Sequence, residues 1–63
     1  MAWSKPVLDG DVYGWYVYRL RDNAMQYWWR GRWQHELEQY ALRSGALRAL
    51  KQAKGKPRKE GVV

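Results

Sequence analysis

Residues 12–33 constrain the fold more than any other part of this sequence. They are dense in Trp, Tyr and Val, whose bulky or branched side chains fit a pleated sheet better than a helix. We therefore predict two strands, over residues 12–21 and 25–34. Asp22 and Asn23 lie between them, and both residue types tolerate the positive φ that a two-residue hairpin turn requires. The stretch thus predicts an antiparallel β-hairpin.

A turn centred on Asp22 and Asn23 determines the register, because paired residues then have numbers that sum to about 45. Side chains alternate between faces, so one face carries an apolar and aromatic set: Val12, Tyr16, Tyr18, Leu20, Met25, Tyr27, Trp29 and Trp33. The other face carries aromatics among arginines: Tyr13, Trp15, Val17, Arg19, Arg21, Trp28, Arg30 and Arg32. In this register Gly14 pairs with Gly31, which we interpret as local sheet curvature.

A two-stranded hairpin is marginal alone, so the apolar face needs a cover from the C-terminal half. The face with the arginines is then left exposed. This arrangement predicts that Trp29→Ala destabilises the protein by ~3–5 kcal/mol, whereas Trp28→Ala is nearly neutral.

From His35 onward the composition shifts to strong helix formers. We expect a helix over residues 35–43, a break at Ser44 and Gly45, and a second helix to about Lys54. Glycine costs about 0.8–1 kcal/mol in a helix interior, and serine is a good N-cap. The apolar stripe shifts at this break, and the second stripe is Leu42, Ala46, Ala49, Leu50 and Ala53.

The alternative makes residues 35–42 a third strand, in which Glu36 and Glu38 would point toward the core at a cost. Either way the fold class is α+β. An antiparallel hairpin, or a three-stranded sheet, is packed on one side by a C-terminal helix or two short helices.

The chain of 63 residues has room for one domain and contains no cysteine, so aromatic packing must replace disulfides. We expect an extended arm over residues 1–8, a domain over residues 9–54 and a disordered basic tail over residues 55–63. The Asp9-Gly10-Asp11 sequence predicts a turn entering the first strand. Formation of a homodimer through an exposed aromatic face is the other remedy for so small a core.

The sequence lacks the residue sets of an enzyme. His35 is the only histidine, and the two serines lie in the arm and at the predicted helix break, so no nucleophile triad is indicated. No glycine-rich phosphate loop is present, and no carboxylate set has the spacing of a metal site. We expect a protein without catalytic residues, cofactor, metal or small-molecule substrate.

The net charge of +6 favours a polyanionic partner. Arginines can contact phosphates and base edges, aromatic rings can stack on unpaired bases, and a basic tail adds affinity that depends on salt. We therefore predict a small accessory or regulatory protein that binds DNA or RNA. The predicted binding residues are Tyr13, Trp15, Arg19, Arg21, Trp28, Arg30, Arg32, Lys56, Arg58 and Lys59.

The aromatic hairpin followed by an Ala/Leu helix is similar in outline to sheet-based DNA-binding domains of phage integrases and plant transcription factors, without a shared residue motif. The alternative function is a small phage-type module that docks on a host protein and inhibits or redirects it. Trp, Tyr and Arg on the same face would serve that role, because they are enriched in interface hot spots. With no apolar run of about 18–20 residues, we expect no membrane span and a cytoplasmic location, in the host cell if the protein is phage-encoded.

Overall fold

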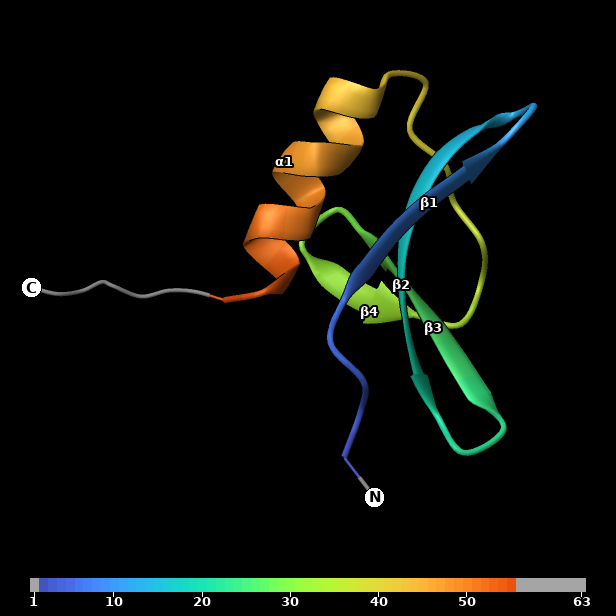
Figure 1. The fold of residues 1–63 in the computed structure, drawn as a ribbon, viewed down its shortest axis with the longest axis vertical. Coiled ribbons are helices and arrows are strands. Elements are labelled where there is room, and N and C mark those ends of the chain that lie inside the picture. The colour runs from blue at the N-terminus through green and yellow to red at the C-terminus, as the bar shows by residue number, and fades with distance from the viewer. Residues whose placement is uncertain (1, 56–63) are drawn as a thin grey trace, which may run out of the picture.

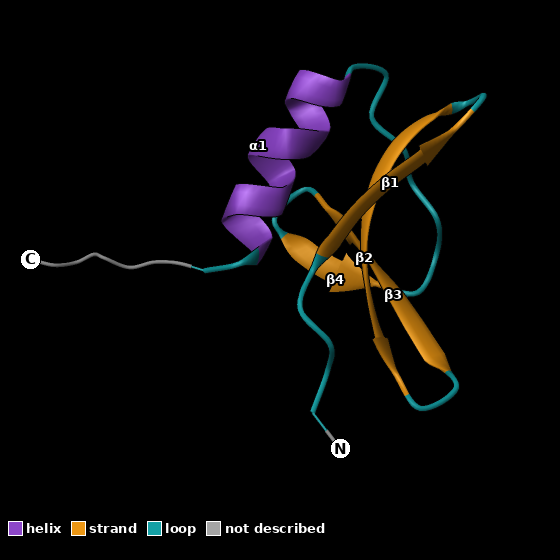
Figure 2. Cartoon of the chain, in the orientation of Figure 1, coloured by secondary structure: helices purple, strands orange, loops and turns teal. Residues whose placement is uncertain are grey.

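A computed structural model describes residues 2–55. The chain forms four strands, β1 (Val7–Asp11), β2 (Gly14–Arg21), β3 (Ala24–Trp29) and β4 (Arg32–Gln34), and one helix, α1 (Arg43–Ala53). The strands make one antiparallel sheet in the order β1-β2-β3-β4, and α1 lies on one side of it (Figures 1 and 2). The predicted α+β class, a hairpin with a C-terminal helix, is confirmed, and the sheet is larger than predicted. Within the described part of the chain, no helix is long and apolar enough to cross a membrane.

The central hairpin has the predicted register. β2 and β3 pair Tyr18 with Tyr27 and Leu20 with Met25. Asp22 has a φ of 52°, as expected for a residue of the tight turn between them. Local turn chemistry and side-chain alternation are therefore sufficient to determine this part of the sheet.

The second predicted strand, over residues 25–34, is wrong as a single element. The chain turns at Arg30 and Gly31, which have φ values of 52° and 84°, and β4 runs back beside β3. Positive φ at both central residues is the requirement of the commonest tight hairpin turn, and glycine meets it without strain. As a result Trp33 pairs with Trp28. The predicted pairs of Trp33 with Val12 and of Gly14 with Gly31 do not form.

The predicted arm and the predicted Asp9-Gly10-Asp11 turn contain a strand instead. β1 pairs with β2, with Leu8 opposite Val17, and the turn lies at the following Val12 and Tyr13. Asp11 stabilises this turn, because its carboxylate accepts hydrogen bonds from the backbone N–H of Tyr13 and from the side chain of Gln39. These hydrogen bonds also lower the pKa of Asp11.

The segment over residues 35–42 forms neither the predicted helix nor the alternative third strand. Only Tyr40 pairs with the sheet: the backbone N–H groups of Trp15 and Tyr40 each donate to the other's carbonyl oxygen. The helix then begins at Arg43, after Leu42 as N-cap, and Ser44 does not cap it. Its end at Ala53 agrees with the predicted end near Lys54.

The helix covers the face of the sheet that was expected to be exposed. Val17 and Ala46 are fully buried, and Ala49 is 4% exposed. The guanidinium of Arg43, at the start of α1, lies 5.7 Å from the ring of Trp15, a neighbour of Val17 on the same face.

The small residues of α1 and β1 explain this choice of face. Alanines at the buried positions of α1 allow the helix to approach the sheet closely. In β1, Gly10 leaves room for the indole of Trp15, since a Cβ at Gly10 would lie 2.8 Å from that ring. The prediction of a hairpin of only two strands did not include β1, which contributes Leu8 and Gly10 to this face.

Candidate functional site

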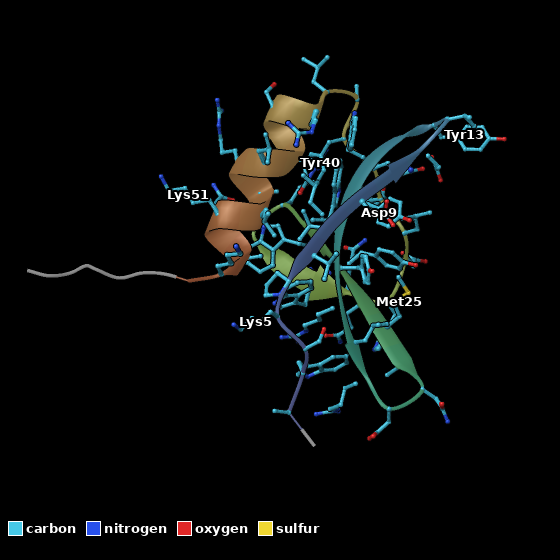
Figure 3. The ribbon with its side chains drawn as sticks, in the orientation of Figure 1. Lys5, Asp9, Tyr13, Met25, Tyr40 and Lys51 are labelled. Atoms are coloured by element: carbon cyan, nitrogen blue, oxygen red, sulfur yellow. The ribbon has the colours of Figure 1, made fainter. Side chains whose placement is uncertain are left out.

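Charged side chains separate onto the two sides of the sheet. α1 and its C-cap expose four cations to solvent: Arg43, Arg48, Lys51 and Lys54. Lys5 lies near the C-terminal end of the helix, beside Lys54. Figure 3 shows Lys5 and Lys51 on the side of the helix, with Asp9 and Met25 on the opposite side. We call the surface that bears α1 and these cations the helix side.

The opposite side of the sheet carries a cluster of aromatic residues that α1 does not cover. We call it the tyrosine face: Tyr16, Tyr18, Leu20, Met25 and Tyr27. The ring of Tyr16 lies 5.9 Å from the rings of both Tyr18 and Tyr27, and Leu20 is 45% exposed. Partial burial and the nearby Asp9 and Asp11 carboxylates raise the pKa of Tyr16. This surface combines aromatic rings with the carboxylates of Asp9 and Asp11.

Two of the predicted stacking residues take part in packing instead. Trp15 lies beneath the start of α1, and Trp28 packs edge-on against Trp33 at 5.2 Å. The indole Nε1 of Trp28 is buried without a hydrogen-bond partner among the described residues. Both rings therefore take part in packing within the protein.

Arg19 and Arg21 hold the N-terminal segment against the sheet. The guanidinium of Arg19 lies between two indoles, 4.3 Å from the ring of Trp3 and 4.4 Å from that of Trp33. It also donates hydrogen bonds to Oε1 of Gln26. The guanidinium of Arg21 also stacks on Trp3, 4.4 Å from its ring. Burial and then the charge of Arg21 lower the pKa of Arg19, although an arginine stays protonated at any physiological pH.

Arg19→Ala is expected to lower the free energy of unfolding by about 1–3 kcal/mol, because it removes two cation–π contacts and the hydrogen bonds to Gln26. Arg21→Ala removes one cation–π contact and is expected to cost less. Urea denaturation followed by circular dichroism measures both. Equal losses at the two positions would contradict a structural role specific to Arg19.

The remaining predicted residues are spread over the molecule. Tyr13 is 82% exposed at the turn between β1 and β2 (Figure 3). Arg30 and Arg32 are exposed at the turn between β3 and β4. The tail residues Lys56, Arg58 and Lys59 lie outside the described residues. The seven predicted residues that the structure describes therefore do not lie together in one site.

A pocket of about 360 Å³ opens between the β3–β4 turn and α1. We call it the turn pocket, and its lining residues are Trp29, Arg30, Gly31, Tyr40, Gly45, Arg48, Ala49 and Gln52. Alternation would place Trp29 on the tyrosine face. Because β3 ends there, its ring instead packs on Tyr40 at 4.9 Å. The hydroxyl of Tyr40 donates to the carbonyl oxygen of Trp28, which fixes the ring in place.

Sequence reasoning identified only Arg30 of this pocket as a binding residue. Tyr40 and Arg48 come from segments far along the chain, and no periodicity indicates that they meet the β3–β4 turn. The one sequence signal for this pocket is Tyr40, an aromatic residue near the end of the segment over residues 35–42, which does not form a helix. Residues 2–55 contain no group of three or more His, Cys, Asp or Glu side chains that could hold a metal ion.

The turn pocket thus combines an aromatic wall with two arginines and a carboxamide, and it lies on the same side of the molecule as the exposed cations of α1. This chemistry suits an anion attached to a planar group. No protein-family model, curated protein or solved structure matches the chain.

Proposed function

We propose that this protein binds nucleic acid through its helix side. The observation that carries the proposal is the separation of charge across the sheet. Arg43, Arg48 and Lys51 are exposed on α1, whereas Asp9 and Asp11 belong to the opposite face. A surface of one sign attracts the phosphate backbone, and the acidic surface behind it orients the molecule toward the polyanion.

The contacts of this surface favour phosphates over a specific duplex sequence. Arg30 adds an exposed guanidinium group next to the helix, and guanidinium groups bind phosphate in a bidentate manner. The aromatic rings of the sheet on this side pack on one another or under arginines: Trp28 on Trp33, Trp33 under Arg19 and Trp15 under Arg43. The binding mode predicted from the sequence, an open aromatic and arginine sheet face, is therefore replaced by a basic surface built on the helix and the β3–β4 turn.

A second candidate function is docking on another protein through the tyrosine face. The specific observation is the exposure of apolar groups there: Leu20 is 45% exposed and the neighbouring Val7 is 39% exposed, next to three tyrosine rings. Exposed apolar patches mark interaction sites, and tyrosine is common in hot spots. This candidate makes no use of the basic side, so variants separate the two functions.

Fluorescence anisotropy with labelled single-stranded and duplex DNA, at about 50 and 200 mM salt, tests the proposal. We expect affinity to fall steeply with salt. The double variant Arg43→Glu/Lys51→Glu lies outside the turn pocket, and it should lose about ten- to hundredfold in affinity near 100 mM salt, with a shallower salt dependence.

Leu20→Ser is the matched control on the opposite side of the sheet. It should bind DNA as the unmodified protein does, because it removes no charge from the helix side. Binding that does not change with salt, or a double variant equal to the unmodified protein, would overturn the proposal. Loss of binding in Leu20→Ser alone would favour the tyrosine face.

A further inference from the structure

We infer that the turn pocket receives one unpaired nucleotide of a bound strand, with its base against Trp29 and its phosphate between Arg30 and Arg48. This inference rests on the proposed function and names the part of the helix side where a base is contacted. Three features of the pocket support it: a fixed aromatic wall, two cations with no acidic side chain among the described lining residues, and small residues at the opening.

The aromatic wall is held before any ligand arrives. Trp29 and Tyr40 pack at 4.9 Å with an angle of 49° between their planes, and the hydroxyl of Tyr40 is hydrogen-bonded to the backbone of Trp28. Partial burial raises the pKa of Tyr40. A tyrosine hydroxyl is protonated at neutral pH even at its ordinary pKa of about 10, so this hydrogen bond is kept. Trp29 is only half-buried and lines the pocket, so part of its ring is available for stacking. A preorganised ring loses little entropy when a base binds.

Two arginines approach the pocket from different elements. Arg30 stands in the β3–β4 turn with its guanidinium 5.7 Å from the ring of Trp29, and Arg48 stands on α1. No acidic side chain is among the lining residues, so neither cation is neutralised within the pocket. Gln52 adds a carboxamide that can donate to or accept from the edge of a base.

Small residues keep the pocket open. A Cβ at Gly31 would meet no atom within 4 Å, and a Cβ at Gly45 would meet only the ring and Cβ of Tyr40 at 3.9 Å. A larger side chain at Gly45 would therefore enter the pocket without colliding with the backbone. The volume of about 360 Å³ is near the lower end of the range for small-ligand pockets, which suits a single nucleotide.

A base inside a duplex cannot reach such a wall, because it is stacked and paired. The pocket therefore predicts a preference for single strands. The probe is labelled oligothymidylate of about ten nucleotides, within the length that small single-strand binding folds cover. It is compared with its duplex with oligodeoxyadenylate and with an abasic strand that carries the same number of phosphates.

Two variants alter the pocket by different means. Arg48→Gln removes one cation of the pocket, and Gly45→Leu fills the space while leaving every charge in place. Lys51→Gln is the matched control, because it removes one exposed cation of the same helix outside the pocket. Thermal melts followed by circular dichroism verify that all three variants fold.

We expect the unmodified protein to bind oligothymidylate about tenfold or more tightly than either the duplex or the abasic strand, which is the scale of one stacked base. Gly45→Leu should abolish this difference, and Arg48→Gln should weaken binding to oligothymidylate more than Lys51→Gln does. If the unmodified protein binds all three probes equally, or if Gly45→Leu keeps the preference, the inference is wrong and the proposed function stands. If no probe binds even at low salt, both are wrong.

Discussion

Replacing Trp28 with alanine is expected to lower the free energy of unfolding by about 3–5 kcal/mol, the usual cost of removing a packed aromatic ring. Trp28 stands in β3 with its ring edge-on to Trp33 at 5.2 Å and its indole nitrogen buried. Its removal leaves a cavity beside Trp33, between β3 and β4. In a domain of this size such a loss is a large part of the total stability, so the variant should be partly unfolded at 37 °C.

Two matched variants make this result specific. Tyr13→Ala removes an aromatic ring that is 82% exposed, and it should be nearly neutral. Trp28→Phe keeps an aromatic ring against Trp33 and removes a buried N–H that has no acceptor among the described residues, so it should cost clearly less than alanine. Denaturation by urea, followed by far-UV circular dichroism, measures all three. A Trp28→Ala protein as stable as the unmodified one would mean that the ring of Trp28 is not packed against Trp33.

The sequence alone predicted that Trp28→Ala would be nearly neutral for stability. Register within the β2–β3 hairpin depends on the turn residues and on alternation, which are local, and it was predicted correctly. Which face is covered depends on partners distant in the sequence. β1 brings Leu8 beside Val17 and Gly10 beside Trp15, and Trp3 stacks on Arg19. Once an arginine is stacked between indoles, its face is no longer the solvent face.

Of the residues that line the turn pocket, the sequence predicted only Arg30 as a binding residue. Its guanidinium lies over the ring of Trp29, which was predicted to lie on the opposite face of the hairpin. Tyr40 and Arg48 reach this pocket only because the helix folds back over the sheet. The turn at Arg30 and Gly31 could have been read from the sequence, since glycine after a polar residue is typical of tight hairpin turns. Recognising it would have divided the second strand correctly.

The second large effect is expected at Gly14, the first residue of β2. Gly14→Ala should lower the free energy of unfolding by roughly 2–5 kcal/mol, as the sum of backbone strain and overpacking. Gly14 has a φ of 148°, and a Cβ there would lie 2.7 Å from the carbonyl oxygen of Tyr40. That carbonyl accepts the hydrogen bond from Trp15, so relief of the clash must disturb the only pairing between Tyr40 and the sheet within residues 2–55.

Gly31→Ala is the control that separates strain from collision. Gly31 also has positive φ, 84°, but a Cβ there meets no atom within 4 Å, so only the strain of about 1–2 kcal/mol applies. A clearly larger loss at Gly14 than at Gly31, measured by urea denaturation, would show that the backbone of Tyr40 presses against β2 in solution. Equal losses would mean that this contact is absent. The same contact places Tyr40 beside Trp29. A loosened Tyr40 in Gly14→Ala should therefore also weaken the preference of the turn pocket for single strands. Arg48→Gln, in contrast, changes the pocket without changing the sheet.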